Sequence, residues 1–240
     1  WSSDVCSSDL CSTMAESLLL GALLVDGGYA DRVVCATCSH FATAERQYRF
    51  PLELGNQRTP TAQWTVTGAG ATLLGRGEAK GLPLRLTAAT IGRVVDKQQT
   101  DINNMGAAMA PAAADTLLAH LRDLHRSVQD YDLIVTGDLG CVGYDLMCLL
   151  CEQKGVSLDG RYIDCGCEVF SPEQDVHAGG SGCGCSACCL NGWLFRRMLS
   201  GEIRRLLFLA TGALMSTTTS QQGESIPAIA HAVTLEVEEG

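Results

Sequence analysis

Apolar residues recur at helical spacing in several stretches of this chain, which predicts amphipathic helices. The first stretch begins where Ser12 or Thr13 can cap a helix, and Glu16 completes an S/T-x-x-E box with Thr13. The Gly27-Gly28 pair is typical of a helix end. The predicted helices lie within residues 11–28, from Pro111 to Val128, 142–155 and 186–201.

Short apolar runs between these helices predict β-strands. Buried strands are expected over residues 31–39, 131–138, 204–214 and 228–238. The stretches 61–75 and 83–95 predict two long strands that the turn "RGEAKG" joins as a hairpin. Because strands and helices alternate, the pattern predicts an α/β fold with buried sheets, and the hairpin makes those sheets mixed.

Length and charge limit the classes of protein that the chain can represent. Its 240 residues allow one large domain or two small ones. The formal net charge of −10 argues against a nucleic-acid partner, which needs a basic face. The longest apolar runs, 18–25 and 206–215, are too short to span a bilayer, so we expect no transmembrane segment.

The first ten residues, "WSSDVCSSDL", differ from the rest because they repeat "SSD" and show no period. We interpret residues 1–10 as a non-native tail and exclude them from the fold. A disordered polar tail is the alternative. In either case we expect an N-terminal part to be missing, since the periodic pattern begins abruptly at Cys11.

The chain has thirteen cysteines, an odd number in a long sequence without a complete secretory signal. This favours reduced thiols over a disulfide framework. Some of these cysteines lie in apolar runs and are expected to pack as small hydrophobes: Cys35, Cys38, Cys148 and Cys151.

The segment "HAGGSGCGCSACCL", residues 177–190, allows three interpretations. A metal site would use cysteines in C-x-C pairs, which differ from the C-x₂-C knuckles typical of zinc: Cys165, Cys167, Cys183, Cys185, Cys188 and Cys189. A redox relay would use Cys185-x-x-Cys188. We favour a glycine loop that opens a helix capped by Ser186 and presents N–H groups to an anion, with no metal site.

Several blocks of the sequence resemble the stage V sporulation protein AD family of endospore-forming bacteria, in the same order and from Cys11 to Glu238. The blocks are "CSTMAESLLLGALLVDGGYAD", "TAQWTVTGAGATLLG", "NNMGAAMAPAAADT", "DLIVTGDLG", "HAGGSGCGCSA" and "FLATGALMSTTTSQQGESIPAIAHAVTLE". That family is similar in fold to thiolases and β-ketoacyl synthases, with two pseudo-equivalent halves in a layered αβαβα arrangement. The resemblance implies that residues 11–100 are the C-terminal part of an incomplete first half and residues 101–240 the second half.

The same resemblance bears on catalysis. Cys11 matches the nucleophile of condensing enzymes, which lies at a helix N-terminus. Thiolases also carry Gly-His-Pro after a Gly-Gly turn and a later Cys-x-Gly, whereas this chain has Ser181 after Gly179-Gly180 and Ala210-Thr211-Gly212 at the second place. The missing elements imply a protein without catalysis, in which Cys11 is a vestigial nucleophile.

The family resemblance implies binding of dipicolinic acid (pyridine-2,6-dicarboxylate), its uptake with Ca²⁺ into the developing spore and its release in germination. It also implies membrane-protein partners from the same operon, a homodimer and a location in the forespore or spore, soluble or peripheral to the inner membrane. No resident cofactor is expected. The candidate ligand-binding residues are Cys11, His177, Gly179, Gly180, Gly182, Cys183, Ser220, Gln221 and Gly223. Two alternatives stay open, an acyltransferase that uses Cys11 and a purely structural scaffold.

The remaining histidines and two arginines carry weaker hypotheses. His120 and His125 are expected on a solvated helix face, and His231 is expected to be structural. His40 stays undecided. Arg46 and Arg49 are expected to form surface ion pairs, with contact to an anionic ligand as the alternative.

Overall fold

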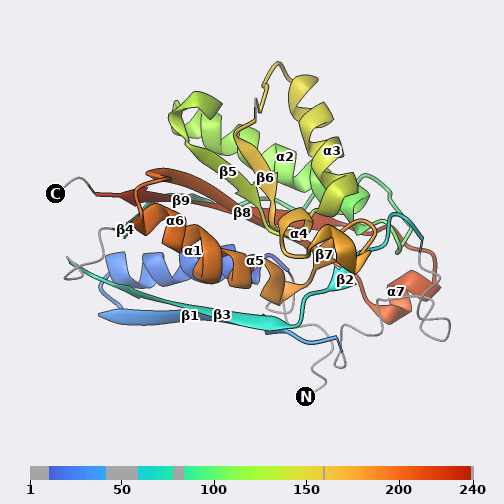
Figure 1. Cartoon of the computed structure of the whole chain (residues 1–240), viewed down its shortest axis with the longest axis horizontal. Coiled ribbons are helices and arrows are strands. Elements are labelled where there is room, and N and C mark those ends of the chain that lie inside the picture. Colours follow the sequence, from blue (N-terminus) through green and yellow to red (C-terminus); the bar gives the residue numbers. More distant parts are fainter. Residues whose placement is uncertain (1–10, 42–58, 78–83, 159, 239–240) are drawn as a thin grey trace.

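The computed structural model describes residues 11–41, 59–77, 84–158 and 160–238. The tail 1–10, Arg46, Arg49 and most of the "RGEAKG" turn lie outside the described residues. The described chain forms stacked layers (Figure 1). A two-stranded sheet lies at one face, helices α1, α5 and α6 cover it, a five-stranded sheet follows, and α2 and α3 lie on the far side. The predicted α/β class with mixed sheets is confirmed.

The central sheet combines strands from distant parts of the chain in the order β4-β9-β8-β5-β6. Its strands are β4 (Leu84–Thr90), β5 (Leu133–Thr136), β6 (Tyr162–Asp164), β8 (Arg205–Ala213) and β9 (Ala228–Val237). Strand β5 runs parallel to β6 and β8, whereas β9 is antiparallel to β8 and β4. The strands predicted over 131–138, 204–214 and 228–238 are confirmed to within two residues at each end.

The predicted hairpin between 61–75 and 83–95 is wrong. Strand β3 (Gly68–Gly75) pairs antiparallel with β1 (Arg32–Ser39), while β4 pairs with β9 in the other sheet. An alternating pattern identifies a strand but not its partner, and here long-range pairing prevails over the local turn signal. The short parallel pair β2 (Trp64–Thr65) and β7 (Gly180–Ser181) was not predicted.

The predicted helices are present, but some bounds differ, and α2 (Met105–Asp123) begins six residues before Pro111 and ends five residues before Val128. Helix α1 runs Thr13–Asp26, but Ser12 makes no capping hydrogen bond. Helix α2 begins before Pro111, because the Asn104 side chain accepts the Ala107 N–H and caps it earlier. Ser186 does not cap a helix either, since α5 begins at Cys183 and buries Ser186. The remaining bounds are α2 Met105–Asp123, α3 Gly140–Glu152, α4 Cys165–Glu168, α5 Cys183–Cys189, a π-turn Leu190–Leu194, α6 Phe195–Leu199 and α7 Thr217–Gln221.

Two hydrophobic cores lie on opposite faces of the five-stranded sheet. Along β8, Leu206 and Phe208 pack toward α1 and α5, whereas Leu207 and Leu209 pack toward α2 and α3. This alternation explains why β8 is apolar at nearly every position. The strand predicted as buried over 31–39 is only half buried, because its outer face is solvated: Val34 is 66% exposed and Leu73 on β3 is 62% exposed.

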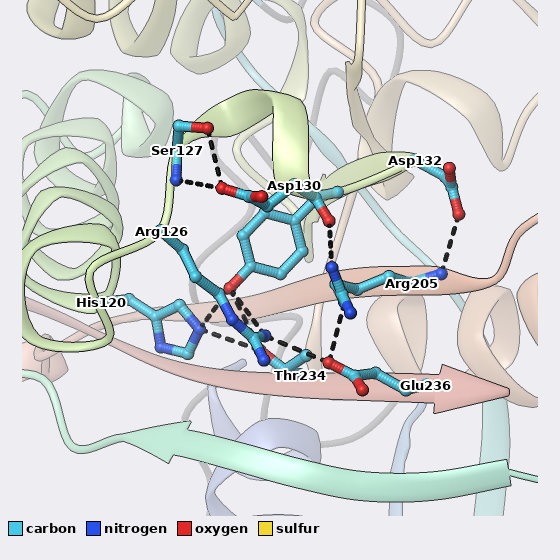
Figure 2. Close-up of polar contacts among 9 residues, drawn as sticks. His120, Arg126, Ser127, Asp130, Asp132, Arg205, Thr234 and Glu236 are labelled. Atoms are coloured by element: carbon cyan, nitrogen blue, oxygen red, sulfur yellow. Dashed lines mark hydrogen bonds and ion pairs between the residues drawn. The ribbon is translucent and has the colours of Figure 1, made fainter. Parts of the chain in front are cut away.

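A network of side-chain hydrogen bonds connects α2 to strand β9 of the five-stranded sheet (Figure 2). His120 is fully buried, so the prediction of a solvated position is wrong, while His125 is exposed as predicted. The His120 ring is hydrogen-bonded to Tyr131 Oη at 3.1 Å and Thr234 Oγ1 at 2.9 Å. Burial, together with the charge of Arg126, lowers the pKa of His120 to about 4.

Charged pairs continue this network at the protein surface (Figure 2). Arg126 and Arg205 both contact one oxygen of Glu236, at 3.1 and 2.8 Å. His231 lies elsewhere on β9, where its Nδ1 accepts the Gly92 N–H at 3.3 Å. That contact agrees with the structural role expected for His231. No helix in the described parts of the chain is both long and apolar enough to cross a membrane.

Candidate functional site

A buried aspartate connects Cys11 to the glycine loop. Cys11 lies two residues before Thr13, the first residue of α1, and its side chain is hydrogen-bonded to the carboxylate of Asp138. Asp138 follows β5 and is fully buried. The position expected for a condensing-enzyme nucleophile is therefore paired with a carboxylate.

The Asp138 carboxylate accepts three further hydrogen bonds. Its Oδ2 accepts the Ser181 hydroxyl at 2.9 Å and the Gly182 N–H at 3.0 Å. Its Oδ1 accepts the Thr211 hydroxyl of β8 at 2.9 Å. Burial raises the pKa of Asp138, and these donors, with Cys11, oppose that rise.

Asp138 was not among the residues singled out from the sequence. It ends the block "DLIVTGD", directly after a buried strand whose neighbours are parallel. Ligands of α/β proteins commonly bind beyond the carboxyl ends of such strands, so a polar residue at this place was the signal that could have found it.

The glycine loop leads from β7 into α5, and its glycines fit closely against neighbouring backbone. A side chain at Gly179 would collide with the Gly166 carbonyl, and one at Gly184 with the Gly68 carbonyl. Gly182 has φ +113, a conformation that residues with a side chain rarely adopt, and its N–H is engaged by Asp138. The requirement for glycine is thus explained by internal packing, and the Gly182 donor is already used.

A second buried carboxylate lies beside the first. Asp164, at the end of β6, accepts the Thr136 hydroxyl at 2.6 Å and the N–H groups of Leu139 and Gly140 at 2.8 Å each. It therefore satisfies two of the N–H donors at the start of α3. Burial, with the nearby charge of Asp138, raises the pKa of Asp164 to about 7.

Other sequence-predicted residues lie away from Asp138. The exposed His177 is hydrogen-bonded through Nδ1 to the Thr59 carbonyl at 3.0 Å. Ser220 donates within α7 to the Ser216 carbonyl, while Gln221 and Gly223 are exposed. Helix α7 lies at one end of the molecule, well to the side of α1 and α5 (Figure 1). The structure brings together Cys11, Ser181 and Gly182 around Asp138.

The cysteines of the loop region contribute mainly to packing. Cys183, Cys185 and Cys189 are buried, and the latter two belong to the hydrophobic core. Within the described residues, no group of three or more His, Cys, Asp or Glu side chains is placed to hold a metal ion.

Solved structures of condensing enzymes share this fold. The 3-oxoacyl-[acyl-carrier-protein] synthase III of Aquifex aeolicus VF5 superposes with a TM-score of 0.56 at 12% identity, over 95% of this chain and 65% of that one. The synthase III of Pseudomonas aeruginosa PAO1 gives a TM-score of 0.57 at 14% identity, over 96% and 66%. The chain is thus an α/β protein with a thiolase-like fold.

Sequence comparison then identifies the family. Residues 5–236 match stage V sporulation protein AD (SpoVAD). The chain is 45% identical over 232 residues to stage V sporulation protein AD of Bacillus subtilis (strain 168), which is 97% of this chain and 68% of that protein. The chain belongs to the stage V sporulation protein AD family and spans about two thirds of the length of the relatives that it matches.

Proposed function

We propose that this protein is a non-catalytic binding protein of sporulation that takes up dipicolinic acid as its calcium complex. The hydrogen bond between Cys11 and Asp138 carries the first half of this proposal. The thiolate of a nucleophilic cysteine is stabilised by a positively charged neighbour, such as an imidazolium. A neighbouring carboxylate instead repels a second negative charge. The pairing of Cys11 with Asp138 therefore favours a ligand-binding protein over an acyltransferase.

The engaged donors of the glycine loop support a calcium complex rather than the free dianion. Gly182 N–H, Ser181 and Thr211 already donate to Asp138, so they are not free to bind an incoming carboxylate. The chain is also acidic, at −10, and gives a dianion no long-range attraction. A calcium ion bound to dipicolinate adds positive charge, and carboxylate oxygens are ligands that Ca²⁺ prefers.

Calorimetry of the chain tests this function. Dipicolinate is titrated with excess Ca²⁺, and again with a calcium chelator, into wild type and Asp138→Asn; Asp145→Asn, an exposed aspartate on α3, is the matched control. We expect binding of the calcium complex by wild type and the control, and weakening by tenfold or more in Asp138→Asn. The proposal would be contradicted if wild type bound free and calcium-bound dipicolinate with equal affinity, or bound neither.

Acyl transfer through Cys11 is the second candidate, since the fold is that of condensing enzymes. Incubation with an acyl-CoA followed by mass spectrometry decides it, because a stable acyl group on Cys11 identifies a nucleophile.

As part of the proposed function, the protein works with membrane proteins of the same operon at the inner membrane of the forespore or spore, and also in germination. The proposed homodimer would bury the exposed apolar pair of Val34 on β1 and its cross-strand neighbour Leu73 on β3, and light scattering measures the oligomeric state.

A further inference from the structure

Two thiols meet at the surface beside the glycine loop. Cys141 is the second residue of α3, and Cys167 is the third residue of α4. The Cys167 thiol donates to the Cys141 sulfur, with 3.3 Å between the two Sγ atoms. Both cysteines are free thiols, Cys141 is exposed, and Cys167 is partly exposed.

The surrounding backbone holds the two cysteines in place without help from the thiols. Gly140 N–H is bound to Asp164, whose carboxyl lies directly before α4, and Cys141 N–H donates to the Ala178 carbonyl at 2.9 Å. Gly166, next to Cys167, fits so closely against the Gly180 carbonyl that a side chain would collide with it. A covalent bond of about 2 Å between the sulfur atoms thus needs mainly side-chain rotation.

We propose that Cys141 and Cys167 form a reversible disulfide, a modification site that accepts oxidising equivalents from low-molecular-weight disulfides. The solvent access of Cys141 distinguishes this pair from Cys165, Cys185 and Cys189, which are buried near one another in the core. The site is independent of the proposed ligand function, because neither sulfur takes part in the Asp138 contacts.

The reaction proceeds by two thiol–disulfide exchanges. The Cys141 thiolate attacks one sulfur of the small disulfide RSSR, forming the mixed disulfide Cys141–S–S–R and releasing one RSH after protonation. The Cys167 thiolate then attacks the Cys141 sulfur and releases the second RSH. Two electrons pass from the cysteine pair to RSSR, and the two cysteine protons leave on the two thiols.

The surroundings of Cys167 make the second exchange the slower one. Burial, and then the negative charge of Asp164, raises the pKa of Cys167, so little thiolate is present at neutral pH. Ring closure is expected to accelerate as pH rises, while the exposed Cys141 reacts first.

Oxidised glutathione is the probe that tests the site. The reduced, folded chain is incubated with it, quenched by alkylation and mapped by mass spectrometry without reduction. We expect a Cys141–Cys167 linked peptide, a mass lower by about 2 Da and reversal by dithiothreitol. Because the bond closes a separation of 26 residues, the midpoint of thermal unfolding rises by roughly 5 °C or more.

Three variants complete the test. Cys141→Ser abolishes the link, and Cys167→Ser retains glutathione on Cys141 because the resolving thiol is gone. Cys38→Ser, which removes an exposed cysteine on β1, behaves as wild type. The proposal is overturned if the folded wild type keeps the glutathione adduct on Cys141, forms its link at other cysteines, or melts at a lower temperature once linked.

Discussion

The carboxylate of Asp138 accepts the N–H of Gly182 at 3.0 Å, and through this bond the end of β5 holds the start of α5. The same carboxylate contacts Cys11, so one buried acid joins the segment before α1, the end of β5 and the start of α5. The charge of Asp138 is therefore central both to stability and to the proposed ligand.

Replacement of Asp138 by asparagine should destabilise the fold. The carboxylate has two acceptor oxygens, whereas the amide of asparagine has one acceptor oxygen and an NH₂ group. Hydroxyl or N–H donors that now face the second oxygen would face this NH₂ group and lose their acceptor. We expect the free energy of unfolding to fall by about 1–3 kcal/mol. Urea denaturation measures it, with Asp145→Asn as the exposed control. A stability equal to that of wild type would mean that these hydrogen bonds contribute little.

Substitution at Gly182 should strain the backbone at the start of α5. Its φ of +113 is rarely adopted by residues with a side chain, so Gly182→Ala should cost about 1–3 kcal/mol of unfolding free energy. Gly192→Ala is the matched control, since a methyl group there meets no neighbour within 4 Å. That variant should be neutral or slightly more stable. Equal losses in both variants would contradict the assignment of strain to Gly182.

Cys11→Ser should preserve ligand binding. A serine hydroxyl can donate to Asp138 as the thiol does, and the proposed function requires no thiolate. We expect affinity for the calcium–dipicolinate complex within a few-fold of wild type by calorimetry. A large loss in this variant, together with an acyl group found on Cys11 in wild type, would favour acyl transfer.

The buried His120 should make the protein less stable in acid. Its pKa is about 4 in the folded state against 6.5 for the ordinary group, so between these values the unfolded chain binds the extra proton. Stability from this residue is complete above pH 6.5 and declines toward pH 4, by roughly 1.4 kcal/mol per pH unit. Compared with wild type, His120→Gln should therefore lose this acid-induced destabilisation when unfolding is measured across the range, while His125→Gln, at an exposed position, should have the wild-type pH profile.

Asp164 should have the opposite effect on stability. Its pKa of about 7 lies above the ordinary 3.8, so the folded state retains a proton that the unfolded chain has lost. Its contribution to stability therefore decreases as pH rises from about 4 to 7. Because His120 and Asp164 oppose each other, wild type shows only their difference. Asp164→Asn should reveal the full acid sensitivity of His120, and a pH profile unchanged from wild type would contradict the raised pKa.

Periodicity predicted the strands and helices better than their partners. The apolar runs of β5 and β8 identify buried strands because both faces of the sheet are covered. The pairing of β4 with β9 could not be predicted, since no local signal near Thr90 points to Ala232. Helix starts failed where a side chain other than the nearest serine satisfied the free N–H groups, as at Asn104.

The candidate site was predicted in part. Motif and glycine pattern led to Cys11 and Gly182, which the structure joins through Asp138. They gave no indication that an internal carboxylate would use the loop donors, because that depends on the three-dimensional approach of β5 to α5. His120 was placed in solvent from its charged neighbours along the sequence, whereas the helix buries it against Tyr131 and Thr234.

The position of β9 within the sheet has a consequence for synthesis on the ribosome. This strand, the last in the described chain, lies between β8 and β4, and it pairs Leu235 with both Leu206 and Leu86. Until it emerges, β4 has no neighbour in that sheet and β8 has an open edge. Contacts between residues so distant in the chain form slowly. The five-stranded sheet therefore closes only after this strand has been synthesised, and until then its unpaired strand edges are open to pairing with other chains.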